Sequence, residues 1–520
     1  MRRVRSFFLN ALILTAVSFI MKAVGVIFNV YVSNRVGAEA MGLFALISGV
    51  YGFAVTLATS GINLAVVRLV SEALGREDGS AVKRIMRRAF IYCLFFGSLS
   101  MLLTYFLSVP IGAHLLGDER TVLSLRIFAV SLPFISLSSA LHGYFTAVRK
   151  AYKNALVSMG EQLIKIFTVA LLLGSFMPRG IEYACVALVL GGAISEVLSC
   201  ACIAALWGIE RLLHGMNTCN GRRSEDGSLL AVSLPVAFSA YARSALITLE
   251  HALIPRGLER SGASHGAALA AYGTLSGMAF PIIMFPSAII YSFAGLLVPE
   301  LAECRERKSY TQIRYIASRA LQLSLIFAIG VAGILISFSS QIGEAIYPGM
   351  GVGRYIALLA PLVPVMYADG AVDAILKGLG FQVFSMNVNI LDSILSVVLV
   401  ALLLPRMGIR GYIVTIFVCE ILNATLSMTR ALTSVGIGVK IFRWIFRPIA
   451  CIAGAAGITR CAIYFSRISA TSPLLLTIFI VLTVLIYLLL LCATDSLTRD
   501  DIRWICEIFF KKRSENASGT

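Results

Sequence analysis

The chain has 520 residues, of which 58% are hydrophobic and only 14% carry a charged side chain. Soluble domains carry about 25% charged residues, so this composition excludes a soluble protein and indicates a polytopic membrane protein. The net charge of +17 does not indicate nucleic-acid binding, because the basic residues lie in short loops between apolar runs.

Apolar runs separated by charged breaks predict fourteen transmembrane helices. Their approximate limits are 7–32, 42–67, 88–110, 123–147, 153–177, 182–207, 229–254, 270–297, 315–338, 354–377, 381–404, 411–432, 441–464 and 472–494. The expected fold class is therefore all-α, with two pseudo-symmetric six-helix lobes around a central cleft and two further C-terminal helices.

The first run, 7–32, is long enough to cross a hydrocarbon core of roughly 30 Å at about 1.5 Å per residue. It is too long for a cleaved signal peptide and lacks a small-residue cleavage site, so we expect an uncleaved helix. Lys22 lies inside this run. A charge at that depth costs roughly 2.5–3.5 kcal/mol on insertion scales, so Lys22 is expected to face protein or water.

Most of the 44 lysines and arginines lie in the tails and breaks on one side of the predicted membrane. Because short loops rich in lysine and arginine stay inside, both termini are expected in the cytoplasm.

Two segments of the chain resemble each other, 61–89 at the end of the second run and 292–320 at the end of the eighth. The same offset places Glu161 on Asp392. Both copies begin on the cytoplasmic side, which predicts parallel repeats that meet at a cleft. The expected parts are an N-lobe 1–210, a cytoplasmic linker 211–228, a C-lobe 229–435, two helices in 436–495, and a cytoplasmic amphipathic tail 496–520.

Three cations lie at membrane depth, and they predict an anion site. Glu161 and Lys165 are four residues apart on one helix, which predicts an ion pair between them. Lys22 and Arg243 have no opposite charge within a helical turn, and each lies on the first helix of its lobe. They predict a cleft that binds an anionic headgroup, unless a neighbouring helix supplies a carboxylate to each. The candidate substrate-binding residues are Lys22, Arg243, Arg68, Lys165, Glu161 and Asn29.

Acidic residues at depth predict a coupling-ion site. Asp369 and Asp373 are four residues apart, so a proton, Na⁺ or Lys377 is needed to neutralise them. Asp392 with Asn389 is a second candidate cation site, against simple hydrogen bonding between helices. The candidate coupling-ion residues are Asp392, Asp369, Asp373 and Asn389.

No set of residues predicts catalysis. The chain contains no GxxxxGK[ST] motif for ATP hydrolysis, and no histidine has metal-ligand spacing to another. Glu250 and His251 form an imaginable acid–base pair, although a polar cluster at the outer helix end is the simpler interpretation. The 11 cysteines are interpreted as small core residues.

Several stretches together resemble a known family. They are Ser60-Gly-Ile-Asn63, Gly143-Tyr-Phe145, Leu253-Ile-Pro-Arg-Gly-Leu-Glu259, Ala271 to Pro281, Phe285-Pro-Ser287, Leu297-Val-Pro-Glu-Leu-Ala-Glu303 and Gly408-Ile-Arg-Gly-Tyr412. In order and spacing these resemble the stage V sporulation protein B group of the multidrug/oligosaccharidyl-lipid/polysaccharide (MOP) exporter superfamily. Members of that group usually carry an arginine where this chain has Lys22.

The resemblance implies a non-enzymatic flippase in the bacterial cytoplasmic membrane. It would move a polyprenyl-diphosphate-linked oligosaccharide such as lipid II to the outer leaflet, for cell-wall or spore-cortex synthesis. The expected partners are this sugar lipid, membrane lipids and cell-wall synthesis enzymes, and we expect a monomer that binds no nucleic acid. No cofactor or metal is expected, and the membrane potential, Na⁺ or H⁺ would drive transport. The alternatives are a drug/cation antiporter of the same superfamily, a membrane-embedded envelope glycosyltransferase, and a scaffold without transport activity.

Overall fold

The structure is a computed structural model that describes residues 2–76, 78–213, 229–436, 438, 440–466, 472–498 and 501. Of the expected linker 211–228, all but the first three residues lie outside the described part. The expected amphipathic tail helix lies outside it from residue 502 onward.

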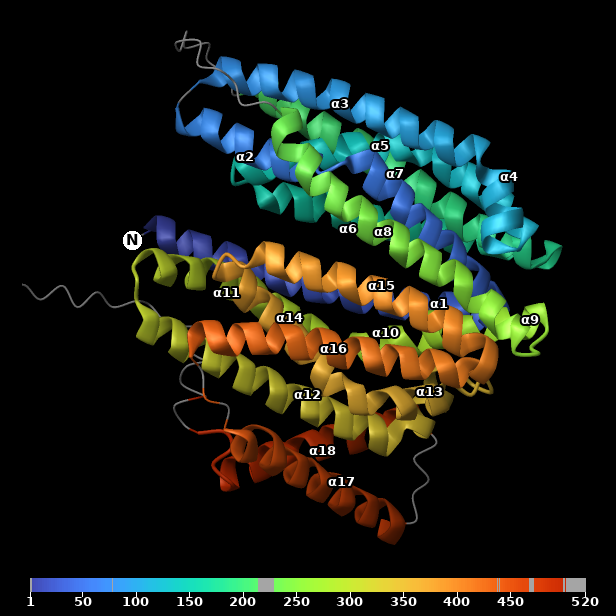
Figure 1. The fold of residues 1–520 in the computed structure, drawn as a ribbon, viewed down its shortest axis with the longest axis vertical. Helices are drawn as coiled ribbons and strands as arrows, with labels where there is room; N and C mark the ends of the chain where they lie inside the picture. The colour runs from blue at the N-terminus through green and yellow to red at the C-terminus, as the bar shows by residue number, and fades with distance from the viewer. Residues whose placement is uncertain are drawn as a thin grey trace, which may run out of the picture. The chain divides into compact units, whose positions relative to one another are not determined.

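Every regular element in the described ranges is helical, which confirms the all-α class (Figure 1). The first half of the chain forms α1 (Arg2–Thr59), α2 (Ile62–Gly75), α3 (Gly79–Phe106), α4 (Ser108–Pro110), η1 (Ile111–Leu116), η2 (Glu119–Thr121), α5 (Val122–Ala147), α6 (Ala151–Phe176), η3 (Met177–Arg179), α7 (Ile181–Leu213) and α8 (Leu229–Arg260). The second half forms α9 (His265–Tyr272), η4 (Gly273–Ala279), α10 (Phe280–Met284), α11 (Ser287–Glu306), α12 (Tyr310–Ile346), α13 (Val352–Leu359), η5 (Ala360–Leu362), α14 (Val363–Gly378), α15 (Gln382–Met407), α16 (Ile409–Val435), η6 (Phe442–Phe446), α17 (Arg447–Ser466) and α18 (Pro473–Ala493).

Thirteen helical stretches of the described chain are long and apolar enough to cross a membrane, where the sequence predicts fourteen. The stretch Phe19–Gly75 has 57 residues and covers the first two predicted runs, which meet at a kink with non-helical backbone at Gly37. The run predicted at 270–297 is instead divided into His265–Met284 and Ser287–Glu306, and α8 is not among the thirteen. The polytopic membrane architecture is confirmed, and the count is approximate.

Glycines mark the points where the long first helix bends and ends. Gly37 has φ 82° and ψ 173° inside α1, a conformation that glycine adopts at little cost. Ser60 and Gly61 have φ of 44° and 71° and separate α1 from α2. A Cβ atom on Gly61 would lie 3.0 Å from the Ser233 carbonyl oxygen of α8, so the close packing of α2 against α8 also depends on this glycine.

The chain separates into two compact units. Unit 1 comprises Met1–Phe19, Ala279–Val388 and Phe417–Thr520, and unit 2 comprises Ile20–Met278 and Asn389–Ile416. In unit 2, α3, α5 and α7 pack side by side, α6 covers α7, and α2 lies against α3 and α5 (Figure 1). The buried face of α2 repeats every three or four residues through Ile62, Ala65, Val66, Leu69, Val70 and Ala73.

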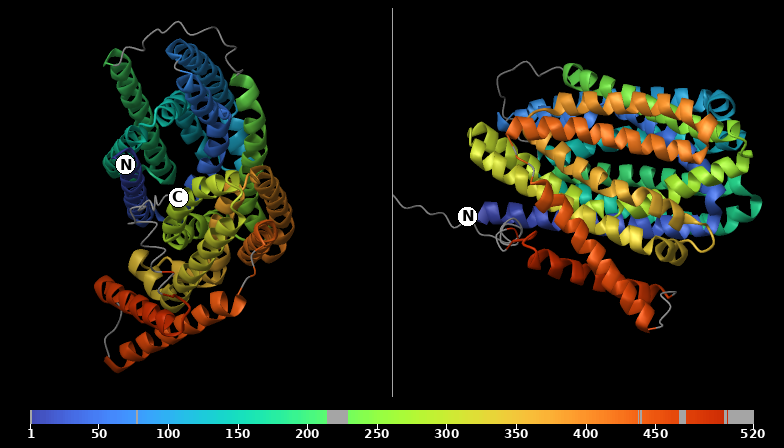
Figure 2. Two further views of the ribbon diagram at one scale, coloured as in Figure 1. Left: turned by 90° about the vertical axis from the view of Figure 1, so that its left-hand side faces the viewer. Right: turned by 60° about the horizontal axis from the view of Figure 1, so that its bottom comes forward.

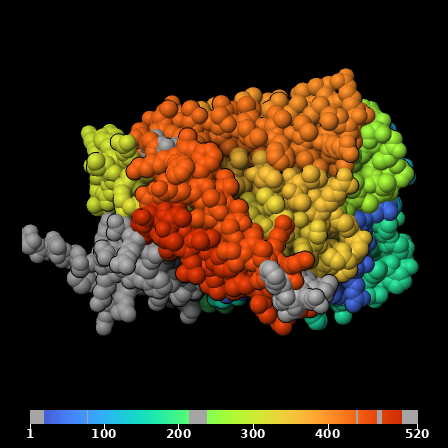
Figure 3. All heavy atoms as spheres, turned by 90° about the horizontal axis from the view of Figure 1, so that it is seen from below, coloured from blue at the N-terminus to red at the C-terminus, as the bar shows by residue number. Residues whose placement is uncertain are grey.

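In unit 1, the helices α17 and α18 pack against each other and against α12. The Tyr487 hydroxyl of α18 donates to the Ile326 carbonyl oxygen of α12 at 2.8 Å. Figure 2 shows this pair from two further directions, and Figure 3 shows it, in orange-red to red, lying against yellow residues of the same unit. Asp501 is fully buried and forms ion pairs with Arg319 and Arg443, which ties the segment after α18 to α12 and η6.

Candidate functional site

Lys22 lies on α1 where that helix meets α6. The Gln162 side-chain amide of α6 donates to the Met21 carbonyl oxygen at 3.1 Å. One turn further along α1, a Cβ atom on Gly25 would lie 3.1 Å from the same amide nitrogen, so α1 and α6 approach closely at this level. The Lys22 side chain is exposed beside this contact.

Glu161 and Lys165 lie on the protein-facing side of α6. The exposed apolar side chains of this helix, Leu156, Leu163, Phe167 and Leu171, repeat at helical spacing and form one stripe. Glu161 and Lys165 lie on the opposite side of the helix from that stripe. Both side chains are therefore directed toward protein, as expected for charges at membrane depth.

The predicted ion pair between Glu161 and Lys165 is wrong for the described structure, where no such pair is formed. Instead, the Ser199 hydroxyl of α7 donates to Glu161 Oε2 at 2.9 Å. Glu196, one turn earlier on α7, lies within electrostatic range of both Glu161 and Lys165. Tyr51 of α1 is close to the two carboxylates as well. The Ser199 hydroxyl of α7, rather than Lys165, is therefore the hydrogen-bond partner of Glu161.

Arg243 lies near the middle of α8 with an exposed side chain. Within the described residues it forms no hydrogen bond or ion pair. The face of α8 that packs on α1 carries Tyr241 and Thr248, whose hydroxyls contact the Ser60 hydroxyl and the Gly49 carbonyl oxygen. Arg243 is separated from Tyr241 and Thr248 by roughly 140–160° around the helix, at about 100° per residue, so it lies on nearly the opposite face. The open alternative, a carboxylate partner from a neighbouring helix, has no support in the described residues.

The remaining two substrate candidates already have partners. Arg68 Nε lies 3.0 Å from Glu72 Oε1 on α2, and its side chain is 64% exposed. Asn29 Oδ1 accepts a hydrogen bond from the Ser33 hydroxyl at 3.3 Å. Both residues are weaker candidates than Arg243, because their polar groups are occupied within their own helices.

The predicted need of Asp373 for a counter-charge is confirmed, and Lys377 provides it. Lys377 Nζ lies 2.5 Å from Asp373 Oδ2, and the Ser385 hydroxyl donates to Asp373 Oδ1 at 2.7 Å. Tyr291 of α11 lies within electrostatic range of Asp369, of Asp373 and of Glu420 on α16. Lys377 therefore neutralises Asp373, and both carboxylates of α14 lie near Tyr291.

A second acidic cluster joins α8 to α15 in unit 2. Glu250 lies close to Ser396 and within electrostatic range of Asp392. Asn389, Asp392 and Ser396 are spaced three and four residues apart, so they share one face of α15. Arg243 precedes Glu250 by two helical turns and shares its face of α8. The sequence does not indicate this pairing, because Glu250 and Asp392 are far apart along the chain.

Glu250 and His251 do not act on each other. His251 faces α1 instead, where a Cβ atom on Gly49 would lie 3.1 Å from His251 Nδ1. Its ring also lies 6.0 Å from the Tyr272 ring, centroid to centroid. The two side chains thus contact different helices, which removes the imagined acid–base pair. No group of three metal-ligating side chains occurs among the described residues.

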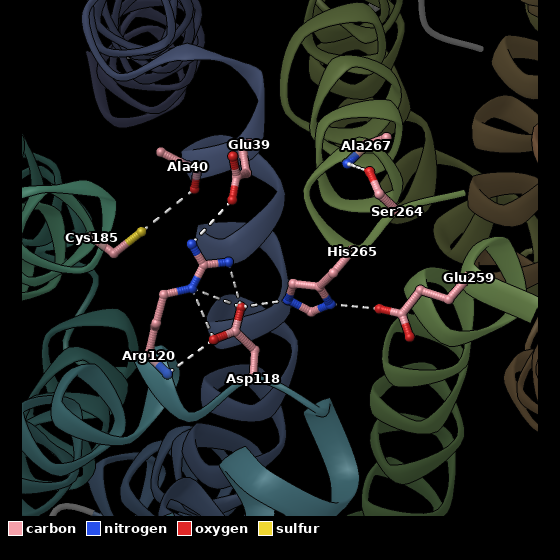
Figure 4. A network of polar contacts seen from close by, with 9 residues as sticks. All are labelled: Glu39, Ala40, Asp118, Arg120, Cys185, Glu259, Ser264, His265 and Ala267. Atoms are coloured by element: carbon pink, nitrogen blue, oxygen red, sulfur yellow. Dashed lines mark hydrogen bonds and ion pairs between the residues drawn. The ribbon is translucent and has the colours of Figure 1, made fainter. Parts of the chain in front are cut away.

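A five-membered charge network lies where the end of α8, the start of α9, α1 and the segment before α5 meet (Figure 4). Arg120 Nη2 lies 2.7 Å from Asp118 Oδ2, and Arg120 Nη1 lies 3.0 Å from Glu39 Oε1. His265 lies between Asp118 Oδ2, at 2.9 Å from Nε2, and Glu259 Oε1, at 2.5 Å from Nδ1. Burial opposes the ionisation of Asp118, but hydrogen bonds from Arg120 and His265 outweigh it and lower the Asp118 pKa. Sequence reasoning missed this network.

Near this network, a pocket of about 430 Å³ is lined by Ser261, Arg406, Met407, Gly408 and Arg410. It lies where α15 ends and α16 begins, and both arginines are exposed.

Comparison with known proteins decides the family. The family model described as "Polysaccharide biosynthesis protein" matches residues 7–305, more than half of the chain. The chain belongs to this polysaccharide biosynthesis protein family. The resemblance noted in the sequence is thereby confirmed.

Relatives and solved structures agree with this family. Stage V sporulation protein B of Bacillus subtilis (strain 168) is 26% identical over 510 residues, which cover 96% of this chain and 98% of the relative. A structure of the lipid II flippase MurJ in an inward closed conformation has a TM-score of 0.70 at 14% identity, over 95% of this chain and 100% of that one. An inward-facing multidrug resistance MATE transporter of the MOP superfamily has a TM-score of 0.65 at 14% identity, over 82% and 98%. The fold of this family member is that of the lipid II flippase MurJ and of the MATE transporter.

Proposed function

We propose that this protein is a flippase that moves a polyprenyl-diphosphate-linked oligosaccharide, such as lipid II, from the inner to the outer leaflet. The headgroup would enter a central cationic cleft that opens alternately to the two sides, while the polyprenyl tail stays in lipid. Family membership and the near full-length similarity to stage V sporulation protein B support this proposal.

The observation that carries the proposal is the state of Arg243. Its guanidinium lies near the middle of α8, at the membrane depth that the sequence predicts, and its exposed side chain has no partner among the described residues. Facing lipid would cost roughly 2.5–3.5 kcal/mol, so the side chain is expected to face water or an anionic ligand. A guanidinium donates two parallel hydrogen bonds to a phosphate group, which suits a diphosphate linkage.

Lys22 and Lys165 would add charge around the same headgroup. Lys22 lies beside the contact between α1 and α6, and Lys165 lies on the protein-facing side of α6. Glu161 accepts a hydrogen bond from Ser199 and forms no ion pair with Lys165, and an anionic headgroup would compete with Glu196 for this lysine. We assign Arg68 and Asn29 a secondary role, since Glu72 and Ser33 already occupy their polar groups.

The membrane potential would be sufficient to drive such transport. A headgroup with two negative charges gains roughly 4–5 kcal/mol on moving outward across about 100 mV, at about 2.3 kcal/mol per charge. A bound Na⁺ or H⁺ at Glu250 and Asp392 would add to this drive, and the Ser396 hydroxyl and Asn389 amide lie on the same face. Asp373 is a poorer ion site because Lys377 neutralises it.

We further propose that the protein resides in the bacterial cytoplasmic membrane with both termini inside, as a monomer of two six-helix lobes. The distribution of lysine and arginine supports this orientation. The substrate chemistry suits cell-wall or spore-cortex synthesis, with the enzymes that make and polymerise the sugar lipid as functional neighbours.

A flipping assay in proteoliposomes tests the proposal. The purified protein is reconstituted with fluorescent lipid II or with a simpler polyprenyl-diphosphate sugar, and a quencher outside reports headgroup movement. We expect protein-dependent flipping of at least one of these lipids, faster with an outward-driving potential. Rates equal to those of protein-free vesicles for both lipids would refute the proposal.

A drug/cation antiporter is the second candidate, and the pair Glu161 and Glu196 favours it. Two neighbouring carboxylates with a nearby tyrosine would suit an organic cation. Uptake of a fluorescent lipophilic cation into the same vesicles separates the two functions. The flippase proposal predicts no cation uptake, and uptake without lipid flipping would favour the antiporter.

A further inference from the structure

The histidine in the charge network is held between two carboxyl groups in a geometry that suits its protonated form. Both ring nitrogens of His265 face carboxylate oxygens, Asp118 Oδ2 at 2.9 Å and Glu259 Oε1 at 2.5 Å. A neutral imidazole has one N–H and one lone pair, so one of these contacts would set a lone pair against an anionic oxygen. An imidazolium donates to both. With both carboxylates ionised, the observed geometry therefore requires a proton on each nitrogen.

The charge balance around the ring leads to the same conclusion. Three carboxylates, those of Glu39, Asp118 and Glu259, surround one guanidinium, that of Arg120 (Figure 4). The Asp118 side chain is only 4% exposed and already bridges Arg120 to His265. Without a charge on His265, this cluster would hold an excess of two negative charges in partly buried surroundings, and a proton on the ring removes half of it.

The other charged groups near the network do not replace this proton. Arg256 of α8 donates to the His114 carbonyl oxygen, and Glu182 of α7 lies within electrostatic range of Cys185 and is not among the partners of His265. His114 and Glu119 are exposed, and their side chains form no ion pair in the described structure. The start of α9 adds its own helix dipole, which disfavours a cation and leaves Asp118 and Glu259 to stabilise the imidazolium.

The network lies beside a tightly closed seam between helices. A Cβ atom added to Gly273 would lie 2.0 Å from the Ala38 carbonyl oxygen, and one added to Gly42 would lie 2.0 Å from the Leu269 carbonyl oxygen. The backbones of α1 and α9–η4 are thus in direct contact one to two turns from His265. Gly37 and Gly262, with φ of 82° and 101°, flank the seam and supply points where the chain can bend.

We propose that His265 is a proton-binding site whose occupancy holds the seam between α1 and α9 closed, and whose proton is exchanged with the outer solution. This inference rests on the alternating access in the proposed function, because an outward-open state requires the seam to separate. Opening removes Asp118 from one side of the ring and weakens its hold on the proton, which then passes to external water. Proton binding and closure therefore favour each other reciprocally.

Hydrogen–deuterium exchange of the full-length protein in lipid nanodiscs tests the site without any substrate. The peptides that cover 37–45 and 264–279 report the seam, and wild type and variants are compared at the same pH. We expect wild type to lose protection in both peptides between pH 6 and pH 8, by up to about tenfold per pH unit. His265→Gln should show the low protection of wild type at pH 8 at both pH values. His265→Arg carries a permanent cation and should show the high protection of wild type at pH 6 at both pH values.

Two further variants test whether the pH response depends on His265 and on its carboxylate partner. His114→Gln changes an exposed histidine on the same side and should keep the wild-type pH response. Glu259→Gln keeps the size of the side chain but removes one carboxylate charge, so it should shift the loss of protection to lower pH. A wild-type pH response in His265→Gln, or no shift in Glu259→Gln, would overturn the proposal.

The exchange readout is independent of lipid flipping. A normal pH response of the seam together with no flipping of either polyprenyl-diphosphate lipid would refute the proposed function and leave the proton site standing. Normal flipping together with no pH response of the seam would refute the proton site and leave the proposed function standing.

Discussion

Replacing Arg243 by alanine should nearly abolish headgroup transport while leaving the protein folded. A hydrogen bond to a charged group contributes about 1.5–3 kcal/mol, and a guanidinium can donate two of them to a diphosphate. Because the Arg243 side chain is exposed, solvent screens the interaction, and we take the equivalent of one such bond rather than two. At about 1.4 kcal/mol per factor of ten, the expected loss is roughly ten- to hundredfold in the flipping rate.

The assay is the initial rate of flipping in proteoliposomes, with the amount of monodisperse protein matched by size-exclusion chromatography. Arg243→Lys keeps the charge but loses the two-pronged geometry, so it should lie between wild type and Arg243→Ala. Arg307→Ala is the matched control, since that exposed arginine at the end of α11 is paired with Glu303 at 2.6 Å. Wild-type flipping by Arg243→Ala at equal protein amount would refute the reasoning.

Three further predictions each concern one aspartate. Asp392→Asn should alter the dependence of flipping on Na⁺ and pH without abolishing flipping, and unchanged ion responses would exclude this site. Asp78 caps α3 by accepting from the Ser80 and Ala81 amides, so Asp78→Ala should lower the thermal unfolding midpoint by a few degrees with normal flipping, as measured by a dye-based melt. The pKa of Asp118 is lower in the folded protein, so its charge stabilises the fold above the unfolded pKa of about 3.9, and that contribution is lost as the pH falls through the folded pKa. Asp118→Asn should therefore lower the melting temperature at pH 7 and have a smaller effect near pH 3, whereas an equal effect at both would contradict this assignment.

Local patterns of the sequence predict local contacts well. Apolar runs of membrane length predict the helices, and the four-residue spacing of Asp373 and Lys377 predicts the pair that the structure contains. The same rule fails for Glu161 and Lys165, because the Ser199 hydroxyl of α7 binds the carboxylate. A same-helix spacing permits a pair but does not exclude a better partner from another helix.

Contacts between distant segments were not predictable from one sequence. His265 meets Asp118 across 147 residues, and only the folding of α9 against α1 brings them together. The pairing of Glu250 with α15 is hidden for the same reason. By contrast, Gly37 lies in the break between the first two predicted runs, and non-helical backbone at this residue separates two helices within α1.

The central claim is that cations at membrane depth recognise a diphosphate, and native mass spectrometry of the detergent-purified protein tests it most directly. Wild type is offered equal amounts of a polyprenyl diphosphate and the corresponding polyprenyl alcohol, and the bound fractions are compared with those of the Lys22→Ala/Arg243→Ala double variant. We predict that wild type prefers the diphosphate at least tenfold and that the double variant binds both lipids equally. An undiminished preference in the double variant would contradict the claim.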